Sequence, residues 1–182
     1  MRLFHFSERA GIAAFQPRPV AAPSERGPGR GWLNGPLVWA IDEPHQPMYL
    51  FPRDCPRILV WPLADSTQDD RAALWGDSRA RMLAFVETGW LARISTGRLW
   101  RYELRSEGFE SLDDAGMWVS RQAATPVDAL EITDLPTALA ETGAELRALP
   151  SLLPLRPVWN SSLHVSGIRL RNALGWPSTT AI

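Results

Sequence analysis

The sequence predicts an α+β protein, and three observations support this class. Short apolar runs typical of strands recur along the 182 residues, with short helical patterns between them in an irregular order. A regular alternation of strand and helix, which would predict a parallel sheet, does not occur. The length suits one domain with a substantial core, and no segment is repeated. We therefore predict a single domain over residues 1–174, with a mobile loop at 21–31 and a loose tail at 175–182.

The amino-acid composition limits which kinds of binding partner and which cellular location we expect for this protein. The net charge of −1 provides no bulk attraction to nucleic acid or to an acidic membrane. All basic residues are arginine, so anion recognition would use guanidinium groups. The single cysteine, Cys55, excludes an internal disulfide and suits a reducing compartment. No apolar run approaches the roughly 20 residues of a membrane helix, and no signal segment opens the chain, so we expect a cytoplasmic protein without membrane contact.

The first half of the chain contains two strands that matter for function. Leu3–Phe6 alternates apolar and polar residues around His5, and Leu37–Ile41 is a continuous apolar run. Asp42 can cap the turn that follows, with Pro44 in its first positions. Further elements in this half are strands at Arg57–Trp61 and Met82–Val86, a helix from the Ser66–Asp69 capping pattern to about Trp75, and a short helix from Thr88 over Leu91 and Ile94.

The second half begins with the clearest amphipathic strand. In Arg98–Leu104, Trp100, Tyr102 and Leu104 share one face, which predicts burial of that face. Further elements are strands at Met117–Ser120, Val127–Ile132 and Ala144–Pro150, a helix capped by Thr133 or Asp134 that ends near Gly143, and a last helix over about Pro157–Leu174 that carries His164 on a solvated face.

Two histidines are the candidates for chemistry. His5 lies between Phe4 and Phe6, where a buried histidine bonded to a backbone carbonyl is the usual interpretation and a binding role is the alternative. His45 follows Asp42 at the turn, so it is either an exposed turn residue or a general acid or base. Cys55 is better explained as a buried structural thiol than as a nucleophile. The three histidines lack a carboxylate spacing typical of metal ligands, so no metal site is predicted.

Several motifs cover nearly the whole chain. The segments Leu3–Glu8, Val38–Arg57, 119–127 and Leu163–Ala173 resemble a bacterial family known only as a domain of unknown function. This resemblance implies no chemistry.

A more distant resemblance does imply chemistry. A first strand with a histidine, a second strand with an aromatic-Ala step, and a late strand before a Pro-Val step are similar to the ADP-ribosyltransferase-like fold. That fold implies a split, antiparallel-rich sheet, and its members include NAD-dependent transferases and RNA 2′-phosphotransferases. The resemblance implies NAD as a cofactor, with His5 on a ribose hydroxyl and Trp39 stacked on nicotinamide.

One position departs from that pattern, because Gln122 stands near the place where the resemblance expects a carboxylate. We therefore predict a protein that binds a nucleotide or a phosphorylated small molecule such as phospho-ribose, with Arg53 and Arg121 on phosphate and Arg18 nearby. If the protein is an enzyme, we expect one of the ADP-ribosyl- or 2′-phosphotransferase type. The alternatives are an inactive binding module of the same fold, and a phosphoesterase or nuclease that uses His5 and His45. The leading hypothesis requires the His5 and Trp39 rings to line one hollow.

Overall fold

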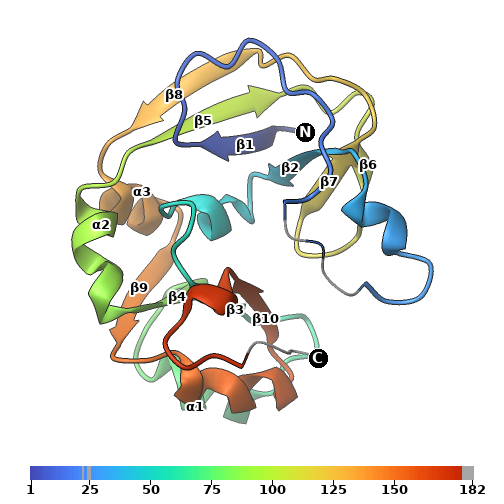
Figure 1. Ribbon diagram of the computed structural model, residues 1–182. Helices are drawn as coiled ribbons and strands as arrows, with labels where there is room; N and C mark the ends of the chain where they lie inside the picture. Colours follow the sequence, from blue (N-terminus) through green and yellow to red (C-terminus); the bar gives the residue numbers. More distant parts are fainter. Residues whose placement is uncertain (22, 24–25, 178–182) are drawn as a thin grey trace. The chain divides into compact units, whose positions relative to one another are not determined.

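A computed structural model describes residues 1–21, 23 and 26–177. These residues form a mixture of short helices and two separate sheets, which confirms the α+β class (Figure 1). The chain divides into two compact units, each built from segments far apart in sequence. Among the described residues, the first unit comprises Met1–Gln46 and Leu99–Ile132, and the second comprises Pro47–Arg98 and 133–177. The assignment of the chain to one domain stays a prediction.

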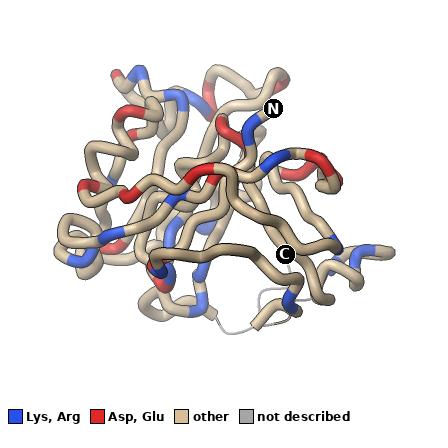
Figure 2. Tube along the Cα trace, turned by 90° about the horizontal axis from the view of Figure 1, so that it is seen from above, with Lys and Arg blue, Asp and Glu red and all other residues tan. Residues whose placement is uncertain are grey.

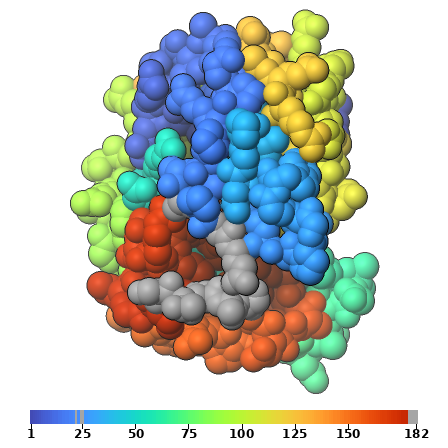
Figure 3. Space-filling view, turned by 45° about the vertical axis from the view of Figure 1, so that its right-hand side comes forward, coloured from blue at the N-terminus to red at the C-terminus, as the bar shows by residue number. Residues whose placement is uncertain are grey.

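The first unit contains a six-stranded antiparallel sheet in the order β6-β7-β2-β1-β5-β8. Its strands are β1 (Leu3–Ser7), β2 (Val38–Asp42), β5 (Leu99–Leu104), β6 (Glu110–Ser111), β7 (Met117–Ser120) and β8 (Asp128–Ile132), and a 3₁₀ turn, η1 (Gly31–Asn34), precedes β2. β1 pairs with β2 through Leu3↔Asp42 and Phe4↔Ile41, so the first strand lies beside the strand predicted at Leu37–Ile41. The space-filling view shows the blue N-terminal segments of this unit next to its yellow segments (Figure 3).

The two faces of this sheet bury different clusters. Residues opposite each other in an antiparallel pair point to the same face, and neighbours along a strand point to opposite faces. One face therefore carries a cluster that includes Leu3, Val38, Ala40 and Leu104, with Phe15, Phe109, Trp118 and Ala124 packed on it. The other face carries a cluster of Leu33, Leu37, Val119, Trp39 and Leu112.

The segment between β1 and η1 crosses the first of these faces and is held there by backbone contacts. The Tyr102 hydroxyl donates to the Arg9 carbonyl at 2.7 Å and accepts from the Ile12 N–H at 3.2 Å. Phe15 and Ala124 exchange two backbone hydrogen bonds. The predicted mobile loop at 21–31 includes residues 22, 24 and 25, which lie outside the described residues.

The second unit contains a four-stranded sheet in the order β10-β3-β4-β9, in which β4 and β9 are parallel. Its strands are β3 (Arg57–Trp61), β4 (Met82–Glu87), β9 (Ala144–Leu149) and β10 (His164–Ile168). Its helices are α1 (Gln68–Trp75), α2 (Leu91–Ser95) and α3 (Leu135–Glu141), and its 3₁₀ turns are η3 (Thr88–Trp90), η4 (Leu153–Asn160) and η5 (Leu170–Asn172), with η2 (Gln46–Tyr49) at the junction of the two units. Every residue of β3 and β4 is buried, as their continuous apolar sequence predicts.

Helix caps follow the sequence closely. Asp134 caps α3, because its Oδ1 accepts from the Thr137 N–H at 3.0 Å. The cap of α1 is Thr67 rather than Ser66, and it accepts from the Asp70 N–H at 3.2 Å. The predicted capping pattern was therefore displaced by one residue.

The predicted last helix over Pro157–Leu174 is wrong. The segment forms η4, then β10 paired with β3, then η5. The pairing of β10 with β3 overrides the helical spacing of the apolar residues. His164 is thus a strand residue stacked on Trp61 at 4.1 Å, and does not lie on a helix face. Trp176, predicted in a loose tail, is buried against the core of this unit, whereas residues 178–182 lie outside the described residues.

Basic and acidic residues are interspersed along the trace (Figure 2). No helix among the described residues is long and apolar enough to span a bilayer. Within the same residues, no three His, Cys, Asp or Glu side chains gather as a metal site would require.

Candidate functional site

Asp42 and His45 form a hydrogen-bonded pair where β2 ends. Asp42 Oδ1 accepts both from the His45 backbone N–H at 3.0 Å and from His45 Nδ1 at 2.7 Å. The first bond is the cap that the sequence predicts, and the second follows because a cap three residues before a histidine brings the ring to the same oxygen. The side chains are 17% and 24% exposed, so the pair is partly sheltered yet reachable by solvent.

Gly116 packs directly against the Asp42 and His45 side chains. Its carbonyl accepts from the Asp42 N–H at 2.9 Å, and its φ of 69° is in the region that favours glycine. A Cβ at this position would overlap the His45 ring and lie 2.6 Å from the Asp42 carboxyl carbon. Only glycine therefore fits against the pair, which holds the carboxylate and imidazole in one arrangement.

The pair has the geometry of an oriented base. Because a carboxylate can only accept, His45 Nδ1 carries the proton in the bond to Asp42. In the neutral ring Nε2 is then the nitrogen that takes up a proton, which is the arrangement used in general acid–base catalysis. Sequence reasoning identified His45 but assigned Asp42 only a capping role.

His5 is fixed by a backbone carbonyl. Its Nδ1 lies 2.8 Å from the Trp39 carbonyl oxygen, and its ring centroid lies 4.3 Å from that of Phe15. Phe15 in turn packs edge-on against Tyr102 at 5.3 Å. The imidazole thus bridges β1 to β2 just past their paired residues, and its place among aromatic rings agrees with the structural interpretation of this histidine.

The Trp39 indole does not share a hollow with His5. The register places His5 on the face of Leu3 and Ala40, whereas Trp39 is opposite Val119 on the other face. The hypothesis that both rings line one hollow is therefore wrong. The sequence did not show which residues of the two strands lie opposite each other, and this register decides the face on which each ring lies. Trp39 Nε1 is buried and has no hydrogen-bond partner among the described residues, and the Arg26 guanidinium lies 5.8 Å from the ring.

The predicted phosphate-binding arginines belong to different units. Arg121 pairs with Glu110 at 2.8 Å and stacks on Trp32 at 4.6 Å, so its charge is compensated. Arg53 belongs to the second unit, and the Arg18 backbone pairs with Leu37. The roles toward NAD that the resemblance gives to His5 and Trp39, and the phosphate roles of Arg53 and Arg121, stay predictions.

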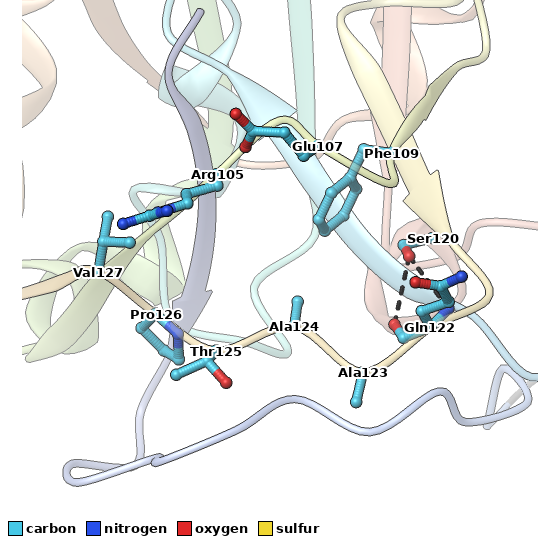
Figure 4. Close-up of a pocket in the computed structure, with 10 residues that line it drawn as sticks. All are labelled: Arg105, Glu107, Phe109, Ser120, Gln122, Ala123, Ala124, Thr125, Pro126 and Val127. Carbon is cyan, nitrogen blue, oxygen red and sulfur yellow. Dashed lines mark hydrogen bonds between the residues drawn. The ribbon is translucent and has the colours of Figure 1, made fainter.

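A pocket of about 650 Å³ opens on the face that carries His5, at the opposite end of β7 from the Asp42–His45 pair. Its lining residues are Arg105, Glu107, Phe109, Ser120, Gln122, Ala123, Ala124, Thr125, Pro126 and Val127 (Figure 4). The Ser120 hydroxyl is buried against the Gln122 backbone, donating to its carbonyl at 3.2 Å and accepting from its N–H at 3.0 Å. The pocket thus has a rigid polar corner beside the Phe109 ring.

Sequence reasoning missed Arg105, Glu107 and Phe109. They lie in the connection after β5, and β2 and β1 separate β5 from β7 in the sheet. The one available signal was Gly108, whose φ of 79° marks a turn. A Cβ on Gly108 would lie 3.9 Å from Gln122 Oε1, so the turn lies against the Gln122 amide.

Comparison with known families gives a match over most of the chain. A model of a family of unknown function, DUF6886, matches residues 4–173. Comparison with curated proteins and with solved structures gives no match. The resemblance to an uncharacterised family is therefore confirmed.

Proposed function

The chain belongs to the DUF6886 family of unknown function, and we propose that the pocket of its first unit binds a nucleotide or a phosphorylated ribose. The observation that carries this proposal is the mixture of groups on the pocket wall. A guanidinium, a carboxylate, an aromatic ring, a hydroxyl and a side-chain amide line one space. The volume of about 650 Å³ also suits a nucleotide, since small-molecule sites measure about 300–1,000 Å³.

Each part of such a ligand has a matching group. Arg105 can bind phosphate oxygens through two parallel N–H groups, and Phe109 offers a ring on which a base can stack. Gln122 and Glu107 can bond ribose hydroxyls, because the amide both donates and accepts while the carboxylate accepts. Glu107 also brings to the pocket a carboxylate that the sequence did not place beside Gln122.

The finer fold hypothesis belongs to the same proposal. The pairing of β1 with β2, the histidine on β1 and the division of the strands into two sheets support an ADP-ribosyltransferase-like arrangement. An ADP-ribosyl- or 2′-phosphotransferase would then use the pocket for its donor, whereas an inactive module would bind the same ligand without turnover. Incubation with labelled NAD and cell extract separates these two, because only a transferase moves the label to an acceptor.

Binding is tested by thermal unfolding with AMP, ribose 5-phosphate, ADP-ribose and NAD. A ligand of the native state raises the melting temperature progressively with its concentration. We expect this rise in the wild type, a smaller one in Arg105→Gln and Gln122→Ala, and an unchanged one in the control Arg9→Gln, an exposed arginine of the same unit outside the pocket. Equal rises in all variants, or none with any ligand, would refute the pocket assignment.

The Asp42–His45 pair favours a second candidate function, phosphoester hydrolysis with His45 as general base. It lies at the start of β7 and the pocket lies at its end, so this reaction would not use the pocket. General acid–base groups contribute about 10²–10⁴-fold to rate. Any hydrolysis of bis(p-nitrophenyl) phosphate should fall by about that factor in His45→Gln, and the activity of Asp42→Asn should also fall while Arg105→Gln keeps it. An unchanged rate in His45→Gln would exclude this function.

A further inference from the structure

The pocket of the first unit carries two opposite charges on one short segment. Arg105 and Glu107 are two positions apart in the connection that follows β5, and both line the pocket. Both are exposed, and neither side chain makes a hydrogen bond or an ion pair with another described residue. Their charges are therefore not compensated within the described part of the chain, and both can act on a bound molecule.

The order of the lining groups indicates where the parts of a ligand would lie. In Figure 4, Arg105 extends toward Val127 at one end of the pocket, and the Ser120–Gln122 corner lies at the other end. Glu107 and Phe109 lie between these ends on the same wall. A ligand with its phosphate on Arg105 and its base on Phe109 would then bring its ribose to Glu107.

A carboxylate at the ribose selects between sugars. It only accepts hydrogen bonds, and the adjacent 2′ and 3′ hydroxyls of ribose can both donate to its two oxygens. A 2′-deoxy sugar offers one donor fewer, whereas a 2′-phosphate brings negative charge to the same place and is repelled. Glu107 thus favours a ribose whose 2′ and 3′ hydroxyls are both free.

No second guanidinium among the described lining residues offsets this repulsion. Arg105 is the one arginine of that lining, and in this arrangement it binds the 5′-phosphate. Arg121 is adjacent in sequence to Gln122, but it pairs with Glu110 at 2.8 Å and lies over the Trp32 ring at 4.6 Å. A 2′-phosphate would therefore meet a carboxylate without a matching arginine fork.

We propose that Glu107 is a specificity-determining residue of this pocket, which takes ribonucleotides and ribose phosphates with free 2′ and 3′ hydroxyls and rejects 2′-phosphorylated ones. The proposal rests on the proposed function of the pocket and narrows its ligand class. Of the two transferase types it favours transfer of ADP-ribose over 2′-phosphotransfer, because the substrate of the second carries a 2′-phosphate.

The test measures binding of AMP, 2′-deoxy-AMP and adenosine 2′,5′-bisphosphate by calorimetry at low salt. We expect the wild type to bind AMP about tenfold more tightly than 2′-deoxy-AMP, since one hydrogen bond to a charged acceptor is lost. The bisphosphate should bind at least about tenfold more weakly than AMP, and less so as the ionic strength rises.

Glu107→Gln keeps the size of the side chain and removes its charge. We expect this variant to lower the preference for AMP over the bisphosphate about tenfold, because the repulsion is lost. The matched control is Asp128→Asn, which removes the same charge from an exposed carboxylate next to the lining residue Val127 but outside the lining. It should keep both preferences of the wild type.

The outcomes separate this proposal from the pocket assignment. If Arg105→Gln weakens AMP binding but the wild type binds 2′-deoxy-AMP as tightly as AMP, or Glu107→Gln keeps both preferences, Glu107 does not select the sugar and the pocket assignment stands. A bisphosphate that binds the wild type more tightly than AMP, or an effect of Asp128→Asn equal to that of Glu107→Gln, also overturns the proposal. If the folded wild type binds none of the three nucleotides, both proposals fail.

Discussion

The two units differ in how deeply their sheets are buried. In the second unit every residue of β3 and β4 is buried, and β4 is flanked by strands on both sides. In the first unit β1, β2 and β5 mix buried with half-buried residues, and four of the five residues of β8 are exposed. The comparison teaches that apolar burial is concentrated in one unit, whereas the other leaves polar side chains within reach of a ligand.

The largest effect is expected from a cavity in the second unit. Leu83 is fully buried in β4, so Leu83→Ala should lower the free energy of unfolding by about 2–5 kcal/mol. Leu130 in β8 is 48% exposed, so the control Leu130→Ala should change it by less than about 0.5 kcal/mol. Urea unfolding curves of the two variants give the comparison directly.

The rate at which the Cys55 thiol reacts gives an independent test of Leu83→Ala and Leu130→Ala. It is the single cysteine, it is buried in the second unit, and burial raises the pKa of its thiol to about 12. The native protein should therefore react very slowly with a thiol reagent at pH 8, and Leu83→Ala should speed the reaction while Leu130→Ala does not. Equal labelling rates would contradict the assignment of stability to the second unit.

A smaller effect is expected at the glycine beside the Asp42–His45 pair. Gly116→Ala adds backbone strain of about 1–2 kcal/mol and forces the His45 ring away from Asp42. Gly11 has a similar φ of 66° and nothing within 4 Å of its Cβ position, so Gly11→Ala isolates the strain. NMR signals of the His45 ring should move only in Gly116→Ala. If both variants leave the signals unchanged, Gly116 does not hold the pair.

The smallest effect is a pH dependence in the second unit. Hydrogen bonds from the Ser162 N–H, the Ser162 hydroxyl and Thr67 lower the pKa of Asp70. A carboxyl whose folded pKa is depressed adds stability above its unfolded pKa, near 4, and loses it as the pH falls through the folded value. The difference in unfolding midpoint between the wild type and Asp70→Asn should therefore shrink from pH 6 to pH 3. The control is Asp69→Asn, which changes the neighbouring carboxylate. A difference in unfolding midpoint between the wild type and Asp70→Asn that stayed constant with pH would contradict the prediction.

Local features of the fold could be predicted from the sequence. The continuous apolar run at Arg57–Trp61 predicts a buried strand, and β3 has those bounds. Asp134, one of the two predicted candidates with Thr133, caps α3, because capping depends on residues three positions apart. The Asp42–His45 contact is local in the same sense, since the cap that the sequence predicts already brings the ring to the carboxylate.

The predictions that the structure contradicts concern contacts between segments far apart in the sequence. The 157–174 segment has apolar residues at helical spacing, but β10 forms there because its residues pair with β3 about 100 positions earlier. The faces occupied by His5 and Trp39 depend on the register of β1 against β2, and a shift by one residue would exchange them.

By itself the sequence determined the α+β class, the bounds of strands such as β3 and β7, and the Asp42 cap at the end of β2. Only the tertiary structure decided that Arg105–Phe109 meets Ser120–Val127 in a pocket, and that Arg53 meets Arg169 in the second unit. The physical reason is that capping and strand propensity depend on neighbours within a few positions. Sheet order and register depend instead on the burial of side chains brought together from the whole chain.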